Sequence, residues 1–507
     1  MKKSEKLYDA ITGISDEYIE EKTIKPKEKF SIRGWLPAIA CAACIALFVG
    51  VFKLLPVRVD MPATDAPAAD EAPKGGDYIG HNEGYTFMSY GGPVFPMTLL
   101  EENGDITAGR HITYNIAANA ESAIVTDAYT LTNTSSEDKT VTAVYPFNGN
   151  LFELESQMPK IIAGGNEIEP AIHEGTYSGK FIGILGPEGA EEGGSYNLDN
   201  ASSWEDYKKV LADGSYMANA FGEMRDLDQE VIVYKFTNHK STGEYAASLG
   251  ISFDRDSKFT KILTLGINGH HETDDHATYS YFLTHAERDK KAVYILVFGE
   301  DIKNCTIQGY KNGACNKGEE LPGATADVER YETTFGEVIK EHIANGGYAI
   351  SFDKNEVNIS EELFYHAVCG LMYKHGPMSE GPAQRYSYGR LDDVLLETLT
   401  HDRVFYLAFD VTIPAGESVE ISAKLTKEAS FDFDCSGSEG SGLRGYDMVT
   451  DLGSNLNYAE QKATVVNKGI LKIVRNNFGF DLENGIDTVT LDTAVEHYYM
   501  EVRKVIG

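Results

Sequence analysis

The densest group of side chains that could do chemistry is the run His270-His271-Glu272-Thr273-Asp274-Asp275-His276. Imidazoles and carboxylates this close together can bind a transition metal such as zinc. The run lies between two segments of strand character, Leu263–Ile267 and Tyr279–Leu283, which indicates the end of a hairpin where polar residues collect for solvation. No pair of ligands at the helical H-x-x-x-H spacing accompanies it. We therefore expect a solvated hairpin end and no metal site.

A second candidate is Asp434-Cys435-Ser436-Gly437-Ser438, which has the D-x-S-x-S spacing of the metal-binding start of a von Willebrand A domain. The segment before it, Ser430–Phe433, alternates in polarity, whereas the buried parallel strand of that fold is a continuous apolar run. The stretch also fails as an EF-hand loop, because position twelve is Leu443 and not Glu. We expect an acidic Gly/Ser loop here.

Four cysteines lie beyond the apolar N-terminal segment: Cys305, Cys315, Cys369 and Cys435. Cys305 and Cys315 flank a turn that contains Gly and Asn, and they are the pair best placed for a disulfide, which would stabilise the fold by about 2–3 kcal/mol. Four reduced thiols are the alternative, and both stay open. Cys369 lies three positions from His366 on one predicted helix, which favours a core thiol beside an imidazole over a catalytic nucleophile.

The sequence signatures of the common enzyme classes are absent. The chain contains no G-x-S-x-G elbow, no H-E-x-x-H, no P-loop and no G-x-G-x-x-G after a strand. The 507 residues include 45 Lys+Arg against 78 Asp+Glu, a net charge of −33. Such a surface repels phosphate backbones, which argues against nucleic-acid binding. We expect no enzyme activity, no cofactor and no nucleic-acid partner.

The segment Gly34–Phe52 reads GWLPAIACAACIALFVGVF, 19 residues without a charge. A helix of that length spans roughly 28 Å, close to the hydrocarbon thickness of a bilayer. Five basic residues crowd its N-terminal side: Lys22, Lys25, Lys27, Lys29 and Arg33. The positive-inside rule therefore predicts that residues 1–33 are cytoplasmic and that the chain after Lys53 is exported. A cleaved signal peptide with a cleavage site near Ala66–Ala68 is the alternative.

The cytoplasmic stub carries one apolar stripe, formed by Leu7, Ile11, Ile14 and Tyr18 at helical spacing. Such a stripe either rests on the membrane surface or docks a cytoplasmic protein. The stub sequence LYDAITGISDEYIEE, followed by a Lys-rich stretch and one span, resembles the leader of single-pass membrane proteins of low-GC Gram-positive bacteria. Some of those proteins are anti-sigma-type regulators, so the resemblance implies a stub that relays a signal inward.

From Arg110 onward the pattern is β, because His111–Ile116, Ala123–Asn133 and Thr140–Phe147 alternate apolar and polar residues. The passage IVTDAYTLTNTSSEDKTVTAVYPF, with GGNEIEP further on, is similar to the N-terminal sandwich that precedes von Willebrand A domains in inter-alpha-trypsin-inhibitor heavy chains. The resemblance implies a β-sandwich and brings no catalytic residue with it.

Further elements follow from the same patterns. We predict helices at Trp204–Ala212 and Ser360–Lys374. The predicted strands are Val231–Thr237, Glu244–Phe253, Ile262–Ile267, Thr278–Leu283, Val293–Phe298, Cys305–Tyr310, Val404–Ile413, Ser418–Leu425, Ile470–Val474, Thr488–Leu491 and His497–Val502.

The sequence therefore predicts a mainly β protein, with a single transmembrane helix followed by β-sandwich-type extracytoplasmic domains and a few helical insertions. The expected divisions are a cytoplasmic stub (1–33), a transmembrane helix (34–52), a linker (53–84), a first β-sandwich domain (85–200), a second β-rich domain (201–355), and a helix insertion with a C-terminal β-rich domain (356–507). The expected function is extracytoplasmic binding or sensing at the cell membrane, with relay through the stub. A structural or adhesive envelope protein and an exported hydrolase with an unrecognised site stay open.

Overall fold

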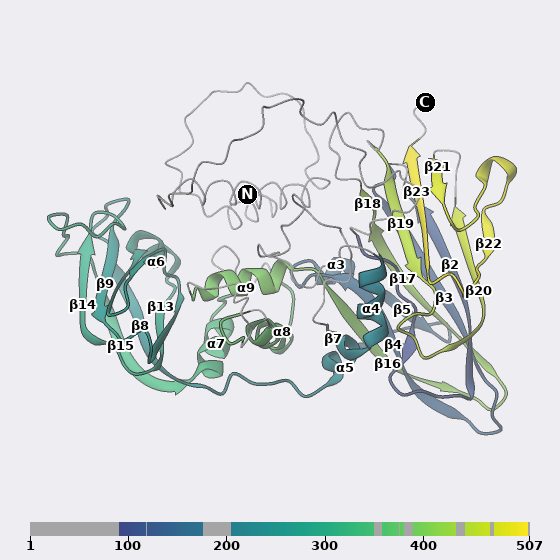
Figure 1. The fold of residues 1–507 in the computed structure, drawn as a ribbon, viewed down its shortest axis with the longest axis horizontal. Coiled ribbons are helices and arrows are strands. Elements are labelled where there is room, and N and C mark those ends of the chain that lie inside the picture. Colours follow the sequence, from purple (N-terminus) through teal and green to yellow (C-terminus); the bar gives the residue numbers. More distant parts are fainter. Residues whose placement is uncertain are drawn as a thin grey trace, which may run out of the picture.

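The computed structural model describes residues 91–117, 119–175, 204–348, 357–374, 376–379, 389–431, 442–466 and 471–504. The predicted stub, transmembrane helix and linker lie outside these ranges, as does the Asp434–Ser438 loop with Cys435. Within them, every helix is too short or too polar to cross a membrane. The described chain is mainly β, as predicted, and forms two β-sandwiches on either side of a layer of helices (Figure 1). We call the sandwich that contains both ends of the described chain the proximal unit and the other one the distal unit.

The proximal unit is built on a seven-stranded central sheet in the order β22-β20-β2-β3-β17-β5-β6. Two four-stranded sheets cover one face of it, the first β1-β4-β16-β7 and the second β18-β19-β23-β21. The strand bounds are β1 Thr98–Leu99, β2 Ile106–Ile116, β3 Ser122–Asn133, β4 Lys139–Gly149, β5 Lys160–Ala163, β6 Asn166–Ile168, β7 Ala171–Glu174, β16 Arg403–Ile413, β17 Ser418–Glu428, β18 Ser430–Phe431, β19 Arg444–Val449, β20 Asn457–Val466, β21 Leu471–Asn476, β22 Thr488–Thr490 and β23 His497–Lys504. The predicted strands of this unit are therefore confirmed, whereas β1, β5, β6, β7, β19 and β20 were not predicted.

Residues suited to tight turns connect two pairs of strands in the proximal unit. Asn133 closes the predicted turn after β3, where its buried side-chain amide donates to the carbonyls of Glu137, at 2.7 Å, and of Ile413, at 3.0 Å. Between β5 and β6 the chain reverses through Gly164 and Gly165, whose φ angles are +56° and +84°. A two-residue hairpin turn needs positive φ at both positions, and glycine adopts it without steric cost.

The proximal unit is discontinuous in sequence. After β7 the chain leaves it, and it returns at β16, which pairs with β4 along all eleven residues from Arg403 to Ile413. The next strand, β17, pairs with β3 from Ser418 to Glu428. The sequence analysis placed β16 and β17 in a separate C-terminal domain that begins at residue 356. The structure corrects this, because both strands lie inside the sheets of the first sandwich. The segment between β7 and β16 is an insertion.

The distal unit is a second sandwich, with sheets β10-β13-β8-β15 and β11-β12-β9-β14. Its elements are β8 Glu230–Lys240, β9 Ser248–Asp254, β10 Thr260–Leu265, β11 Gly269–Glu272, β12 His276–Phe282, α6 Leu283–Asp289, β13 Val293–Gly299, β14 Lys303–Tyr310 and β15 Thr325–Thr334. The six strands predicted here are present, with ends that differ by a few residues. Aromatic and aliphatic side chains such as Phe236, Ile251 and Tyr279 fill the space between the two sheets.

The helical layer joins the two sandwiches. It consists of α7 Phe335–Ala344, α8 Glu361–Lys374, which was predicted, and α9 Leu391–Thr400. Its apolar side chains share one hydrophobic core with Leu263 and Leu296 of the distal unit and with Phe405 of the proximal unit. Three further helices, α3 Leu154–Gln157, α4 Trp204–Asp213 and α5 Ser215–Phe221, belong to the proximal side, and α4 confirms the predicted helix at Trp204.

Candidate functional site

A buried ion pair occupies the middle of the proximal unit. Arg110 on β2 and Asp127 on β3 face the covering sheets, and both side chains are 0% exposed. The guanidinium Nε lies 2.8 Å from Asp127 Oδ1 and Nη2 lies 2.9 Å from Oδ2, a two-point contact that fits the two planar groups. Apolar residues of β2 on one side of Arg110 pack under the first covering sheet, and those on the other side pack under the second. The pair therefore marks the junction between two cores.

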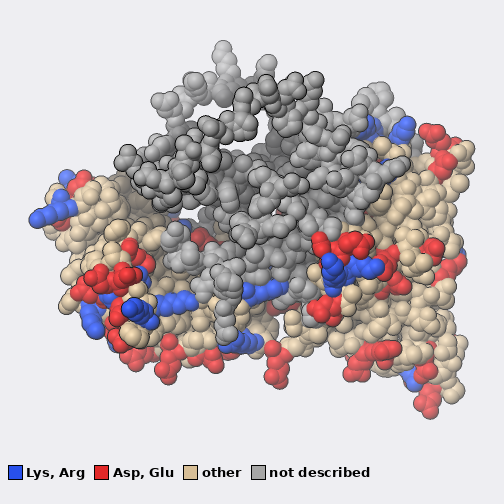
Figure 2. Space-filling view, in the orientation of Figure 1, with Lys and Arg blue, Asp and Glu red and all other residues tan. Residues whose placement is uncertain are grey.

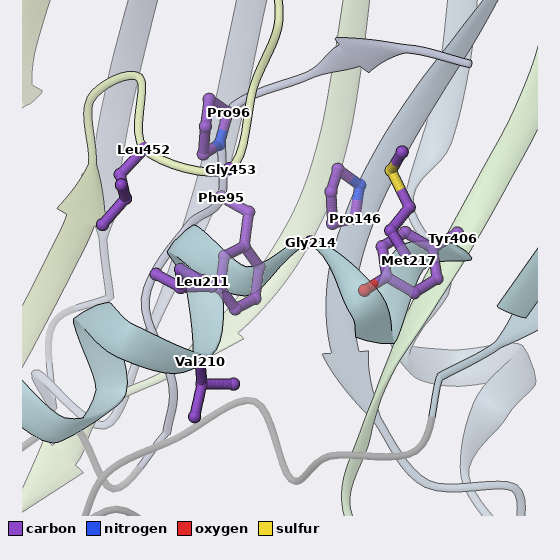
Figure 3. A pocket seen from close by; sticks show the side chains of 10 residues that line it. All are labelled: Phe95, Pro96, Pro146, Val210, Leu211, Gly214, Met217, Tyr406, Leu452 and Gly453. Atoms are coloured by element: carbon purple, nitrogen blue, oxygen red, sulfur yellow. The ribbon is translucent and has the colours of Figure 1, made fainter. Parts of the chain in front are cut away.

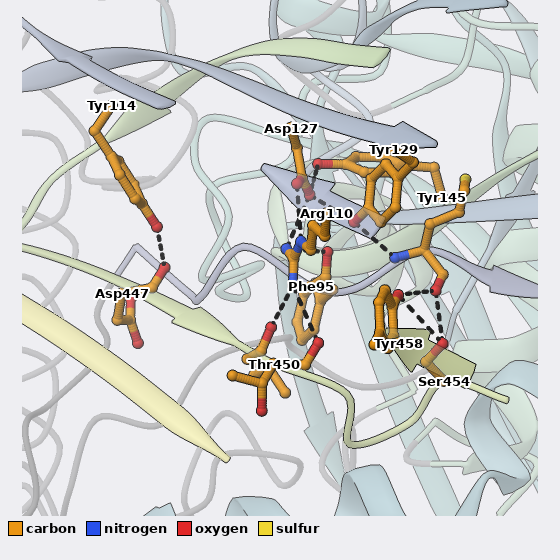
Figure 4. Close-up of polar contacts among 12 residues, drawn as sticks. Phe95, Arg110, Tyr114, Asp127, Tyr129, Tyr145, Asp447, Thr450, Ser454 and Tyr458 are labelled. Carbon is orange, nitrogen blue, oxygen red and sulfur yellow. Dashed lines mark hydrogen bonds and ion pairs between the residues drawn. The ribbon is translucent and has the colours of Figure 1, made fainter. Parts of the chain in front are cut away.

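The remaining N–H groups of Arg110 reach both covering sheets (Figure 4). Nη1 donates to the carbonyls of Val449, at 2.6 Å, and Thr450, at 3.2 Å, at the end of β19. Nη2 also donates to the carbonyl of Phe95, at 3.2 Å, in the segment that leads into β1. All five donors of the guanidinium thus have acceptors.

Tyrosines complete the carboxylate side of this cluster. The hydroxyls of Tyr129 and Tyr145 donate to Asp127 Oδ2 at 2.7 Å and 3.3 Å, and the Tyr129 hydroxyl accepts from the backbone N–H of Met97 at 3.0 Å. Burial raises the pKa of both tyrosines well above the ordinary value. Burial alone would lower the pKa of Arg110, but the charge and hydrogen bonds of Asp127, together with smaller contributions from Tyr129 and Tyr458, outweigh it and raise the pKa well above the usual value. Through these contacts the cluster ties β2 and β3 of the central sheet to the backbone of both covering sheets.

A small apolar cavity lies between α4–α5 and the first covering sheet (Figure 3). Its volume is about 60 Å³, and its walls include Phe95, Pro146, Leu211, Met217 and Tyr406. Pockets that bury a small-molecule ligand generally measure about 300–1,000 Å³. This cavity is therefore too small to serve as a metabolite site.

The His270–His276 run lies on a hairpin, as predicted, but the strands of that hairpin are β11 and β12. The prediction paired Leu263–Ile267 with Tyr279–Leu283, whereas β10 and β12 belong to different sheets and His270, His271 and Glu272 themselves lie on β11. The carboxylates of the run have partners within the distal unit, since Glu272 pairs with Arg255 at 2.6 Å and also accepts from the Tyr279 hydroxyl. His276 Nδ1 lies 2.9 Å from Asp254 Oδ1 at an exposed position. Over the described ranges, three or more His, Cys, Asp or Glu side chains nowhere come together in a metal-binding arrangement.

The three described cysteines, Cys305, Cys315 and Cys369, are free thiols. Of the two alternatives that the sequence left open, the structure therefore has the reduced thiols and no Cys305–Cys315 disulfide. Cys315 Sγ lies against Gly250 of β9, whose register partner on β14 is Gln308. Cys305 is three residues further along β14, a distance of roughly 10 Å along the strand, whereas disulfide Cβ atoms lie about 4 Å apart. Burial raises the pKa of Cys369 to about 12, which keeps this thiol protonated and unreactive.

A polar cluster that sequence reasoning missed fastens the connector between α5 and β8 to the helical layer. The Tyr365 hydroxyl donates to Asp226 Oδ1, and Lys340 Nζ lies 3.5 Å from Asp226 Oδ2. The Tyr373 hydroxyl donates to the Asp226 carbonyl at 2.8 Å. The hydrogen bond from Tyr365 lowers the pKa of Asp226. A lone acid in a polar connector gives no signal in the sequence, because its partners are more than a hundred residues away.

Comparison with protein-family models finds no match, and comparison with curated proteins finds none either. The likenesses noted for the leader and for the first sandwich therefore stay predictions.

The junction generates the first prediction. Replacing Asp127 with Ala leaves the Arg110 charge buried without a partner, so we expect the free energy of unfolding to fall by about 3–5 kcal/mol. Chemical denaturation of the full-length chain in detergent micelles measures it. Asp289→Ala, which breaks the exposed pair between Arg288 and Asp289, is the control and should cost less than about 1 kcal/mol. If the two variants lose the same amount of unfolding free energy, the Arg110–Asp127 pair contributes no more to stability than an exposed ion pair.

The hairpin generates the second prediction. Replacing His271, Asp274 and His276 together with Ala should change the Tm of the full-length chain by no more than about 2 °C, because exposed polar contacts contribute little. Added Zn²⁺ should leave the Tm of both proteins unchanged. A Zn²⁺-dependent rise in Tm that the triple variant loses would instead identify a metal site on this hairpin.

Proposed function

We propose that this chain is an extracytoplasmic binding or sensing protein, anchored in the membrane by residues 34–52 and binding its ligand through the distal unit. The anchor rests on the uncharged 19-residue segment and its basic flank. The choice of the distal unit as the ligand-binding part rests on two observations, the position of Gly91 and the exposure of Tyr245.

The described chain enters at the proximal unit. The backbone N–H of Gly91 donates to Ser430 Oγ at 2.8 Å, and Lys427 Nζ donates to the Gly91 carbonyl. The distal unit lies at the opposite end of the long axis, beyond the helical layer (Figure 1). A tether that arrives at Gly91 therefore leaves the distal loops as the part furthest from the point of attachment.

Tyr245 is the observation that carries the proposal. It lies in the loop between β8 and β9 and its surface is 78% exposed. The loop is held in place, because Thr284 Oγ1 donates to the Tyr245 carbonyl at 3.1 Å and the Ser241 hydroxyl donates to Glu287. An exposed aromatic on a fixed loop offers a large contact area at a small cost in conformational entropy. Binding proteins use such residues as anchors.

The surface charge fits a soluble ectodomain. Figure 2 shows Asp and Glu side chains on both units, with Lys and Arg interspersed among them. A net negative charge keeps such a unit soluble and disfavours docking on anionic lipid. The relay part of the proposal rests on the stub, where Leu7, Ile11, Ile14 and Tyr18 would contact a cytoplasmic protein.

The distal loop generates the third prediction. A photoreactive benzoylphenylalanine in place of Tyr245, in the full chain on intact wall-stripped cells, should give a discrete cross-linked adduct under irradiation. The same residue in place of Ile124, which is 44% exposed on the proximal unit, is the matched control and should give none.

The orientation of the chain is tested on the same cells, where added protease should remove the mass after Lys53. Protection of that mass, or the absence of any adduct at position 245, would refute the proposal.

The stub generates the fourth prediction. The pair Ile11→Asp and Ile14→Asp places two charges on the apolar stripe, and burial of each isoleucine is worth about 1.5–3 kcal/mol, so docking should be lost. Co-purification of cytoplasmic proteins with the full-length chain, wild type against double variant, measures it. If the wild-type chain retrieves nothing above background, the relay fails and an anchored structural role replaces it.

A further inference from the structure

The two sheets of the distal sandwich end side by side in β14 and β15, at the left end of the molecule (Figure 1). At one end of this edge the two sheets touch, because Gly309 lies directly against the carbonyl of Ala324 and leaves no room for a Cβ. At the other end the Arg330 guanidinium pairs with Asp301 at 2.8 Å. We call the stretch of β14 and β15 between these two contacts the open edge.

Two apolar side chains of the open edge face the core of the sandwich and are only partly covered. Ile307 of β14 is in register with Ile251, and Val328 of β15 is in register with Phe236. Register partners of an antiparallel pair have their side chains on the same face of the sheet. Ile251 and Phe236 are 0% exposed, whereas Ile307 and Val328 are each 38% exposed. Ile307 and Val328 are therefore core positions that the described chain leaves partly uncovered.

The chain itself places an extended segment on the outer side of β14, the side away from β9. The N–H of Lys311 donates to the carbonyl of Glu319 at 2.9 Å. The N–H of Leu321 donates to the carbonyl of Gly309 at 2.7 Å. Because backbone groups alternate between the two sides of a strand, the N–H and C=O of Ile307 point to the same side as the carbonyl of Gly309. In the described part of the chain β14 is the last strand of its sheet, so an added strand could continue this pairing past Ile307.

A β-bulge limits the length of the strand that can be added. The register of β14 with β9 shifts between Lys303 and Thr306, and Asn304 has a φ angle of +52°. Asn304 Nδ2 donates to Asp254 Oδ2 at 2.7 Å, which holds the bulge in place. Bulges bend an edge strand and interrupt its pairing with further strands. The open edge therefore fits a short extended peptide better than the long edge strand of a second copy.

The charge around the open edge favours a basic peptide. Arg330 is occupied by Asp301 and Glu332, at 2.8 and 3.2 Å. Acidic side chains outnumber basic ones in the segment that contains β14, β15 and their connection. The acidic ones are Glu300, Asp301, Glu319, Glu320, Asp327, Glu329 and Glu332, and the basic ones are Lys303, Lys311, Lys317 and Arg330. Such a surface attracts Lys and Arg and repels acidic partners.

We propose that the open edge binds a short basic peptide in extended conformation, as an added strand of the β14 sheet. The peptide runs antiparallel to β14, in the direction that Glu319 and Leu321 already take, and its backbone pairs with the N–H and C=O of Ile307. One apolar side chain of the peptide covers Ile307 and Val328. In this mode of recognition the backbone pairing supplies affinity and the alternate side chains supply selectivity. The proposal concerns a surface other than the Tyr245 loop, and it does not depend on the membrane anchor.

The test measures the binding of the fluorescein-labelled peptide KTVTVTK to the purified full-length chain in detergent micelles, by fluorescence anisotropy. Its valines alternate with polar residues, and its terminal lysines supply the charge, so we expect saturable binding. The peptide KTVPVTK has the same charge, but its proline lacks an N–H for strand pairing, so its Kd should be at least about tenfold higher. No saturable binding of KTVTVTK, or equal Kd values for the two peptides, would overturn the proposal.

Variants of the chain locate the binding. Ile307→Lys and Val328→Lys each place a positive charge where the apolar side chain of the peptide would lie, so each should raise the Kd for KTVTVTK by at least about tenfold. Ile124→Lys, at a side chain 44% exposed on the proximal unit, is the matched control and should leave the Kd unchanged. Tyr245→Ala should also leave it unchanged, which separates a failure of the open edge from a failure of the Tyr245 loop. If either edge variant, folded by circular dichroism, binds as tightly as the wild type, the proposal is wrong.

Hydrogen–deuterium exchange of the wild-type chain tests the same site without a substitution. Bound KTVTVTK should slow exchange in residues 303–310, because the N–H of Ile307 becomes hydrogen-bonded to the added strand. Exchange in β3 of the proximal unit should not change. Protection that appears only outside residues 303–310 would place the peptide elsewhere and refute the open edge.

Discussion

The fold of the proximal unit depends on one interaction, the buried pair between Arg110 and Asp127. Removing two charges from water is costly, and the cost is offset only when every remaining donor and acceptor is satisfied. For Arg110 those acceptors are the carbonyls of Phe95, Val449 and Thr450, which come from opposite ends of the described chain. The central sheet alone cannot satisfy them. The pair is therefore stable only when both covering sheets are in place, and it fixes where one ends and the other begins.

The same interaction explains why sheets so different in sequence order form one unit. Strand β2 presents Ile106 and Ala108 to the first core and Ile112 and Tyr114 to the second, with Arg110 between them. A slip of one residue would turn every one of these side chains to the solvent face. A charged residue in the middle of an otherwise apolar stripe thus makes an incorrect register more costly than an apolar residue would.

Much of the β structure could be predicted from alternation, because the central sheet of the proximal unit has one buried face. Arg110 and Asp127 could also have been recognised from the sequence, because each stands at a position of its strand whose neighbours two residues away point into the core. A buried charge at such a position requires a partner of opposite charge. What the sequence could not provide was partnership across long separations: the parallel pairing of β20 with β2, the return of β16 to β4, and the contact of Asp226 with Tyr365. The sequence also left the Cys305–Cys315 disulfide open, because proximity in sequence does not tell whether two residues lie at the same level of a sheet. The mainly polar strand β15 was missed because, as an edge strand, it buries little apolar surface.

The discontinuous proximal unit has a consequence for how the chain is made. Strand β7 ends at Glu174 and β16 begins at Arg403, so 228 residues must be synthesised before β4 and β3 meet their partners. At about 5–20 residues per second, this interval lasts on the order of 10–50 s. During that time two long strands expose unpaired edges, which are templates for pairing with other chains. The distal sandwich has its own core and can form in the interval, so a nascent chain passes through a state in which the later-made unit is folded and the earlier one is still open.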